Sequence, residues 1–171
     1  MLTADELVEM EIVDALAKKL VTHLEESAGD IDLVHVHGAR SSTVQTIVSR
    51  LLVAHLGFSP ELVLAPVDGF VTQARPDFFY RLSEDRGVLA EVERGGTTTN
   101  NHDLNDLWKA HIAPNAHHLF LVVPHANWRE GGIARERPYA RVVKRLEAFF
   151  GDSRREVDVL SLHLFGYGRS V

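Results

Sequence analysis

The chain has 171 residues, of which 45% are hydrophobic and 25% are charged, and it contains no cysteine. These values fit a chain with a full hydrophobic core, so we expect residues 1–171 to form a single domain, with 1–38 as a helix-strand extension of its core. The lack of cysteine excludes disulfide bonds and thiolate metal sites. The net charge of -6 argues against a surface that attracts nucleic acid everywhere, but it permits a local basic groove.

The sequence shows no sign of membrane insertion or export. It has no apolar run as long as the roughly 18 residues that a transmembrane helix needs. The opening segment lacks the basic-then-apolar order of a signal peptide, so we expect a cytoplasmic protein with no membrane partner. It also has no internal repeat and no low-complexity linker that would divide the domain.

The first half of the chain begins with a strong helix signal. Thr3 and Glu6 have the capping-box spacing, and apolar residues recur behind them at helical intervals. Gly38 and Gly57 are positioned to end the elements that precede them. The expected elements are a helix over about 4–26, a strand over 32–37, a helix from 41 or 42 to 56, and a short strand over 62–64.

Two neighbouring segments have the composition of paired strands. Arg75–Tyr80 and Val88–Arg94 are rich in aromatic and aliphatic residues, and a polar, glycine-containing turn separates them. Because side chains alternate between the two faces of a strand, Glu91 and Glu93 should lie on one face of the second strand. A hairpin would bring Asp77 close to both glutamates.

Three carboxylates on one face of a hydrophobic sheet repel one another and are costly to desolvate. A hard divalent cation, with Mg2+ as the natural candidate for carboxylate oxygens, would relieve both effects. The same alternation is typical of a strand with one solvated face. An ordinary polar surface is therefore the competing interpretation of this hairpin.

The second half of the chain alternates helices with strands. A loop of glycine and small polar residues occupies 95–101, and the apolar residues from Leu104 to Ile112 have helical spacing. The pattern then predicts a strand over 117–123, a helix from Pro138 to about 150, and a last strand over 157–165. Helices between strands favour an α/β fold with a central mixed β-sheet flanked by helices on both faces.

This order of elements, together with its motif, resembles a known family. Asp77 in a Pro-Asp dipeptide, the hairpin to Glu91-x-Glu93, and the later helices and strands are similar to the PD-(D/E)xK nuclease superfamily, which has the restriction-endonuclease-like fold. The resemblance covers roughly residues 40–165. It implies that Asp77 and Glu91 bind Mg2+, with Mn2+ as a substitute. Glu93 stands where the family usually has a lysine, and some restriction enzymes of the family carry Glu-x-Glu there.

The resemblance implies hydrolysis of phosphodiester bonds by metal-activated water, with DNA as the favoured substrate. The backbone carbonyl of Val92 would complete the metal shell, and Glu93 would hold the attacking water or receive its proton. The cation expected at the phosphate is Lys109 on the third helix, or Arg81 on the Asp77 face of its strand. Lys109 is favoured over Arg94, which alternates to the opposite strand face. Double-strand cleavage in this family suggests a homodimer, for which the long N-terminal helix is a candidate interface.

The loop and helix after the hairpin offer phosphate contacts. Short hydrogen-bonding side chains lie there beside a helix N-terminus, a place that attracts anions. Ordinary capping and turn formation is the competing interpretation of these residues. Trp108, in contrast, continues the apolar stripe of the helix, and we expect it in the core. The candidate substrate contacts are Arg81, Thr97, Thr98, Thr99, Asn100, Asn101, His102 and Asn105.

Two other interpretations remain open. A catalytically inactive domain of the same fold would serve as a binding or assembly module, which the missing lysine and the acidic composition favour. Alternatively, His35 and His37 would share one strand face and form the centre of a Zn2+ hydrolase. An expected loop after the apolar strand contains further candidate substrate or partner contacts: His125, Asn127, Trp128 and Arg129.

Overall fold

The computed structural model describes residues 2–61, 64, 75–151 and 157–170. Its α-helices are α1 (Ala4–Glu26), α2 (Ala28–Val34), α3 (Ser41–Arg50), α4 (His102–Ile112) and α5 (Pro138–Phe150). Its strands are β1 (Ser59–Pro60), β2 (Phe78–Arg81), β3 (Gly87–Val92), β4 (His118–Pro124), β5 (Asn127–Trp128), β6 (Ala134–Glu136) and β7 (Ser161–Tyr167). A π-helical segment (Leu51–His55) extends α3, and a short 3-10 helix (Glu130–Gly132) joins β5 to β6.

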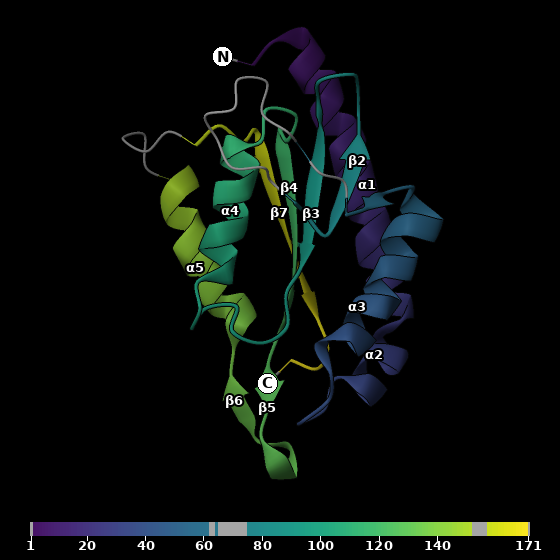
Figure 1. The fold of residues 1–171 in the computed structure, drawn as a ribbon, viewed down its shortest axis with the longest axis vertical. Helices are drawn as coiled ribbons and strands as arrows, with labels where there is room; N and C mark the ends of the chain where they lie inside the picture. Colours follow the sequence, from purple (N-terminus) through teal and green to yellow (C-terminus); the bar gives the residue numbers. More distant parts are fainter. Residues whose placement is uncertain (1, 62–63, 65–74, 152–156, 171) are drawn as a thin grey trace.

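The main sheet is mixed, and its strand order is β1-β2-β3-β4-β7. The pairs β1-β2 and β2-β3 are antiparallel, whereas β3, β4 and β7 run parallel. Each parallel step needs a crossover, and α4 and α5 supply these crossovers on one face, with α1, α2 and α3 on the other (Figure 1). The expected α/β fold, with a mixed sheet flanked by helices on both faces, is therefore confirmed. β5 and β6 form a separate two-stranded hairpin that extends beyond the end of β4.

The sheet separates two hydrophobic cores. Along β3, Val88 and Ala90 pack into the core beneath α1 and α3, while Leu89 packs into the core beneath α4 and α5. β4 is buried along its whole length because helices cover both of its faces. Glu91 shares the face of Leu89, so β3 directs this carboxylate toward α4.

The described part of the N-terminal extension contains two helices, α1 and α2, and no strand. The capping box between Thr3 and Glu6 begins α1 as expected. The strand expected at 32–37 is wrong, because α2 covers the first half of this segment and a turn covers the second. Leu33 lies on the outer face of α2 and is 77% exposed, whereas Ile31 on the inner face is buried. Packing of one helical face, with its period near four residues, therefore decides the conformation here.

Three expectations in the second half also need correction. The last strand begins at Ser161, later than expected, and continues to Tyr167. The segment expected to be a loop after β4 contains the β5-β6 hairpin. Trp108, expected in the core, is 58% exposed, because Leu107 and Ala110 form the buried stripe of α4.

The helix expected from residue 41 or 42 to 56 corresponds to α3 and the π-helical segment that extends it to His55. The strand expected over 62–64 lies outside the described residues except for Leu64, which forms an isolated bridge. Across the described ranges, none of the helices combines the length and the apolar composition that crossing a bilayer requires.

Candidate functional site

The β2-β3 hairpin brings Asp77 and Glu91 together. Phe78 pairs with Ala90, so the next step outward places Asp77 beside Glu91. The Asp77 amide donates to Glu91 Oε2 at 3.2 Å, and the Val92 amide donates to Asp77 Oδ2 at 3.1 Å. The predicted proximity of these two carboxylates is confirmed, and each carboxylate accepts a backbone N-H from the opposite segment.

Glu93 lies just beyond the end of β3 and is held from three sides. Its amide donates to Val122 O at 2.8 Å, and its carbonyl accepts a hydrogen bond from the Tyr167 hydroxyl at 2.8 Å. Its carboxylate oxygen Oε2 lies 2.8 Å from His102 Nδ1. β4, β7 and α4 therefore fix the position of Glu93.

Helix α4 contributes a lysine and a buried acid. Lys109 Nζ lies 2.7 Å from Glu91 Oε1 and 2.9 Å from Asp106 Oδ1. Lys109 and Asp106 are three positions apart, so both project from the same face of the helix. Lys109, predicted as the cation at the phosphate, thus lies at the carboxylates. Sequence reasoning misses Asp106. Its signal is an acidic residue inside the stripe that Leu107 and Ala110 bury.

The buried acids and the lysine of this cluster influence one another. Burial raises the pKa of Glu91 well above its ordinary value, and the negative charge of Asp106 adds to the shift. Burial likewise raises the pKa of Asp106, while Lys109 opposes this shift. Burial alone would lower the pKa of Lys109, but its contacts with the two carboxylates raise it. The three pKa shifts are consistent with one another. Two carboxylates stabilise the one ammonium group, which raises its pKa, but one ammonium group cannot offset the burial of both carboxylates.

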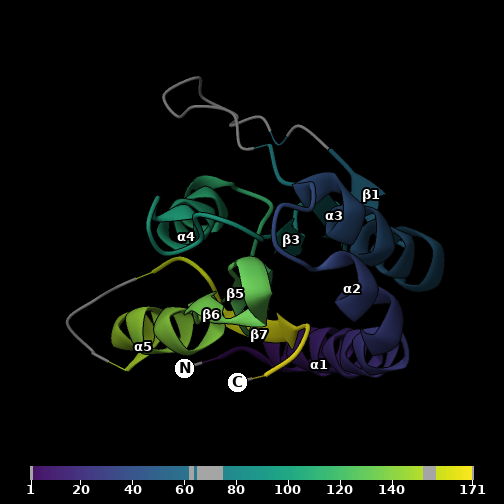
Figure 2. The same cartoon turned by 90° about the horizontal axis from the view of Figure 1, so that it is seen from below.

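The cluster faces an open hollow of about 320 Å³. Its walls come from α3, from the β2-β3 hairpin and from α4, and Figure 2 shows β3 between those two helices. The lining residues are Val44, Gln45, Asp77, Glu91, Val92, Glu93, Arg94, Gly95, His102, Lys109 and Tyr167. Carboxylates held at the wall of such a hollow can meet a ligand from solvent.

The residues present suit a hard divalent cation in their chemistry. Asp77, Glu91 and Glu93 offer the carboxylate oxygens that Mg2+ prefers. Asp106 Oδ2 is buried and has no hydrogen-bond partner among the described residues, a condition that a cation would relieve. Within the same part of the chain, no three acidic or histidine side chains already converge as a metal-ligand group. Lys109 is the cation at Glu91, so a metal ion there would compete with its ammonium group.

Most of the predicted substrate contacts lie away from the carboxylates. Arg81 is four residues along the strand from Asp77, roughly 13 Å by the rise of a β-strand, and it donates to Glu84 O at 2.6 Å. Among the predicted contacts, His102 lines the hollow. Arg94, which strand alternation places on the opposite face, also lines it, because β3 ends before this residue.

The loop before α4 is held by its own contacts. Thr97 is fully buried, and Arg145 of α5 donates to Thr98 O at 3.0 Å and to Asn101 Oδ1 at 2.7 Å. Asn100 donates its amide proton to a carbonyl within the loop. The burial of Thr97 and the hydrogen bonds of Thr98, Asn100 and Asn101 favour turn formation over phosphate binding for these four residues. Thr99 and Asn105 are exposed, outside the carboxylate hollow.

His35 and His37 connect two segments of the chain. His35 Nε2 donates to Ala126 O at 2.8 Å, and His37 Nδ1 donates to Trp128 O at 3.1 Å. The strand face that the two rings were expected to share is replaced by α2 and a turn. The Zn2+ hypothesis therefore loses its geometric basis.

No family model, curated protein or solved structure matches this chain. The resemblance to the PD-(D/E)xK superfamily stays a prediction from Asp77, from the Glu91-x-Glu93 segment and from the order of elements around them. The function is therefore inferred from the carboxylate cluster, its hollow and the neighbouring cations.

Proposed function

We propose that this chain is a Mg2+-dependent nuclease of restriction-endonuclease-like fold that hydrolyses phosphodiester bonds in DNA. The observation that carries the proposal is the convergence of Asp77, Glu91 and Lys109 at the wall of an open hollow. Phosphodiester hydrolysis needs anionic ligands for a metal ion and a cation for the phosphate, and this cluster contains both. The antiparallel hairpin followed by two parallel strands supports the proposed fold.

The residues of the cluster would take separate roles. Asp77 and Glu91 would hold Mg2+, which when bound supplies Lewis-acid stabilisation and lowers the pKa of water. Glu93 would hold the attacking water through Oε1 and take its proton, while His102 keeps the carboxylate oriented through Oε2. Lys109 would turn from Glu91 toward the phosphate and stabilise the negative charge that develops there.

A binding or assembly module of the same fold is the second candidate. Lys109 already neutralises part of the carboxylate charge, and the described residues hold no ready-made group of metal ligands. In such a module the cluster would be a structural ion-pair network. It would need no divalent cation.

Cleavage of supercoiled plasmid, with and without Mg2+ or Mn2+, tests the nuclease proposal. The wild type should nick or linearise the plasmid only with metal, and Asp77→Asn should abolish this cleavage. Glu84→Gln is the matched control, because it removes an exposed carboxylate from the turn of the same hairpin. Metal-dependent cleavage that survives in Asp77→Asn would overturn the assigned site.

Calorimetric titration with Mn2+ separates the two candidates. The nuclease proposal predicts binding that Glu91→Gln removes and Glu84→Gln leaves unchanged. A wild type that binds no metal, and cleaves neither plasmid, single strands nor RNA, would favour the module.

A further inference from the structure

Three further hollows are linked to the carboxylate hollow, directly or through one another, by shared lining residues. The hollow beside β5, of about 340 Å³, shares Arg94 and Gly95 with it. This second hollow shares Arg135 and Glu136 with a third one, of about 390 Å³, against α5. On the opposite side, a hollow of about 320 Å³ along α3 shares Asp77 with the carboxylate hollow. Shared lining residues thus connect the four hollows in order from α3, past the carboxylates, to α5, and we call this series the track.

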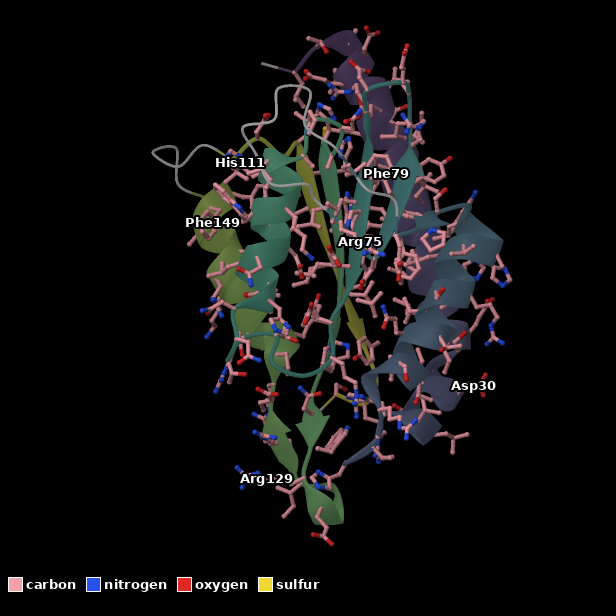
Figure 3. All side chains as sticks on the ribbon, in the orientation of Figure 1. Asp30, Arg75, Phe79, His111, Arg129 and Phe149 are labelled. Atoms are coloured by element: carbon pink, nitrogen blue, oxygen red, sulfur yellow. The ribbon has the colours of Figure 1, made fainter. Side chains whose placement is uncertain are left out.

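The α5 end of this track is basic. It carries four cationic side chains, all exposed, which we call the basic face: Arg135, Arg137, Arg141 and Lys144. None of the four forms an ion pair with another described residue, and Glu136 beside them is occupied by a hydrogen bond from Asn127. In a chain of net charge -6, these cations are a local excess of positive charge. Figure 3 shows the hairpin next to this face extending below the sheet, with Arg129 near its outer end.

The basic face is held in a defined position relative to the carboxylates. Asn127 Nδ2 donates to Arg94 O at 2.9 Å and to Glu136 Oε1 at 2.8 Å. This side chain therefore ties both strands of the hairpin to the segment that follows β3. His37 supports the hairpin from the α2 side through its hydrogen bond to Trp128 O. The hairpin, which includes Arg135 of the basic face, is therefore fixed relative to the segment that follows the carboxylates of β3.

The α3 end of the track has a different character. Its hollow contains Glu61, which is paired with Arg75 at 2.7 Å, and the shared Asp77. The other polar groups there are neutral hydroxyls and an amide, from Ser42, Gln45, Thr46 and Ser49. Such groups offer hydrogen bonds but no neutralisation of phosphate charge. The two ends of the track therefore differ in how they can hold a polyanion.

We propose that the basic face and the β5-β6 hairpin form an arm that binds the sugar-phosphate backbone of a nucleic acid on one side of the cleavage position. The position of cleavage rests on the proposed function, whereas binding by the arm does not. Exposed arginine and lysine side chains without acidic partners are the groups that neutralise phosphates. The backbone on the α3 side would be held by hydrogen bonds alone.

Fluorescence anisotropy tests the arm. The probes are a fluorescein-labelled DNA duplex and the matching single strand, in a KCl series without divalent metal, so that binding is measured apart from cleavage. The arm variant carries Arg137→Ser, Arg141→Ser and Lys144→Ser. The matched control removes three exposed cations from α1 and α3 by Lys18→Ser, Lys19→Ser and Arg50→Ser. Both variants change the net charge equally and replace no buried side chain.

The arm variant should lose about tenfold or more in affinity, and the slope of log Kd against log salt should fall by about 3, because each phosphate contact contributes about 0.9 to it. The control should keep the slope of the wild type. An equal loss of affinity in both variants would overturn the arm, and so would an unchanged slope in the arm variant. A wild type that binds neither probe would overturn it as well.

Binding and cleavage can fail separately in these experiments. A wild type that binds DNA through the basic face but cleaves nothing with Mg2+ or Mn2+ would support the arm and overturn the nuclease. Cleavage by the arm variant with the rate and salt dependence of the wild type would overturn the arm and support the nuclease.

Discussion

Lys109 Nζ lies 2.7 Å from Glu91 Oε1, so an ammonium group from α4 is the direct counterion of a buried carboxylate on β3. The same ammonium lies 2.9 Å from Asp106 Oδ1. One cation shared by two buried anions leaves negative charge uncompensated. This arrangement should control the stability of the metal-free protein as well as its affinity for a divalent cation.

Replacing Lys109 with methionine should lower the free energy of unfolding of the metal-free protein by about 2 kcal/mol, because two buried carboxylates lose their shared counterion. Solvent moderates the loss, since the Lys109 side chain is 33% exposed. Urea unfolding at about pH 8 measures the change. Lys144→Met removes an exposed cation and should change the free energy by less than about 0.5 kcal/mol. Equal losses in the two variants would contradict the counterion role.

The same Lys109→Met variant should bind Mn2+ more tightly than the wild type while cleaving DNA more slowly. Tighter binding follows because the ammonium group no longer competes for Glu91, and slower cleavage follows because the phosphate loses its cation. Calorimetry and plasmid nicking measure the two effects. Weaker metal binding in this variant would show that Lys109 and the metal do not compete.

Asp106→Asn should flatten the dependence of stability on pH. Burial raises the pKa of Asp106 from 3.8 to about 7. The folded state therefore keeps a proton that the unfolded chain has released, so stability falls as pH rises from about 4 through about 7. Asparagine does not ionise, and the variant should exceed the wild type by about 1–2 kcal/mol at about pH 8.

Thermal unfolding of the metal-free protein across this pH range tests the effect of Asp106. Asp30→Asn, on the exposed surface of α2, is the control and should follow the curve of the wild type. If Asp106→Asn were less stable than the wild type at about pH 8, ionised Asp106 would be a stabilising group and the explanation would fail.

Gly87→Ala should disturb the hairpin that aligns the carboxylates. An added Cβ would lie 2.6 Å from Tyr80 O and would overlap the Phe79 ring. We expect a loss of about 2 kcal/mol in the free energy of unfolding, together with weaker metal binding. Gly95→Ala is the control, because a Cβ there meets nothing within 4 Å. Chemical denaturation of both variants measures the difference, and a fully stable Gly87→Ala protein would contradict this packing.

Local patterns predict the elements that have one clear period. Three such patterns predict the elements that form: the alternation in β3, the helical spacing in α4 and the continuous apolar run of β4. The segment 32–37 has no such pattern, because a short run of aliphatic residues and histidines is compatible with either a helix or a strand. The burial of Ile31, on the inner face of α2, selects the helix. The position of β7 depends similarly on its pairing with β4.

For the candidate site, spacing along the chain is enough to identify Asp77, Glu91 and Glu93, because two strands joined by a short turn leave little choice of register. Lys109 is predicted from its place on the polar face of the next helix. Asp106 emerges only from the fold, because its burial depends on how α4 lies across β3. The residues of the basic face lie close together in the sequence, in β6, at the N-cap of α5 and within α5, but their place beside the carboxylate hollow depends on the fold. Local spacing decides which side chains share a face, whereas the packing of distant elements decides which faces meet.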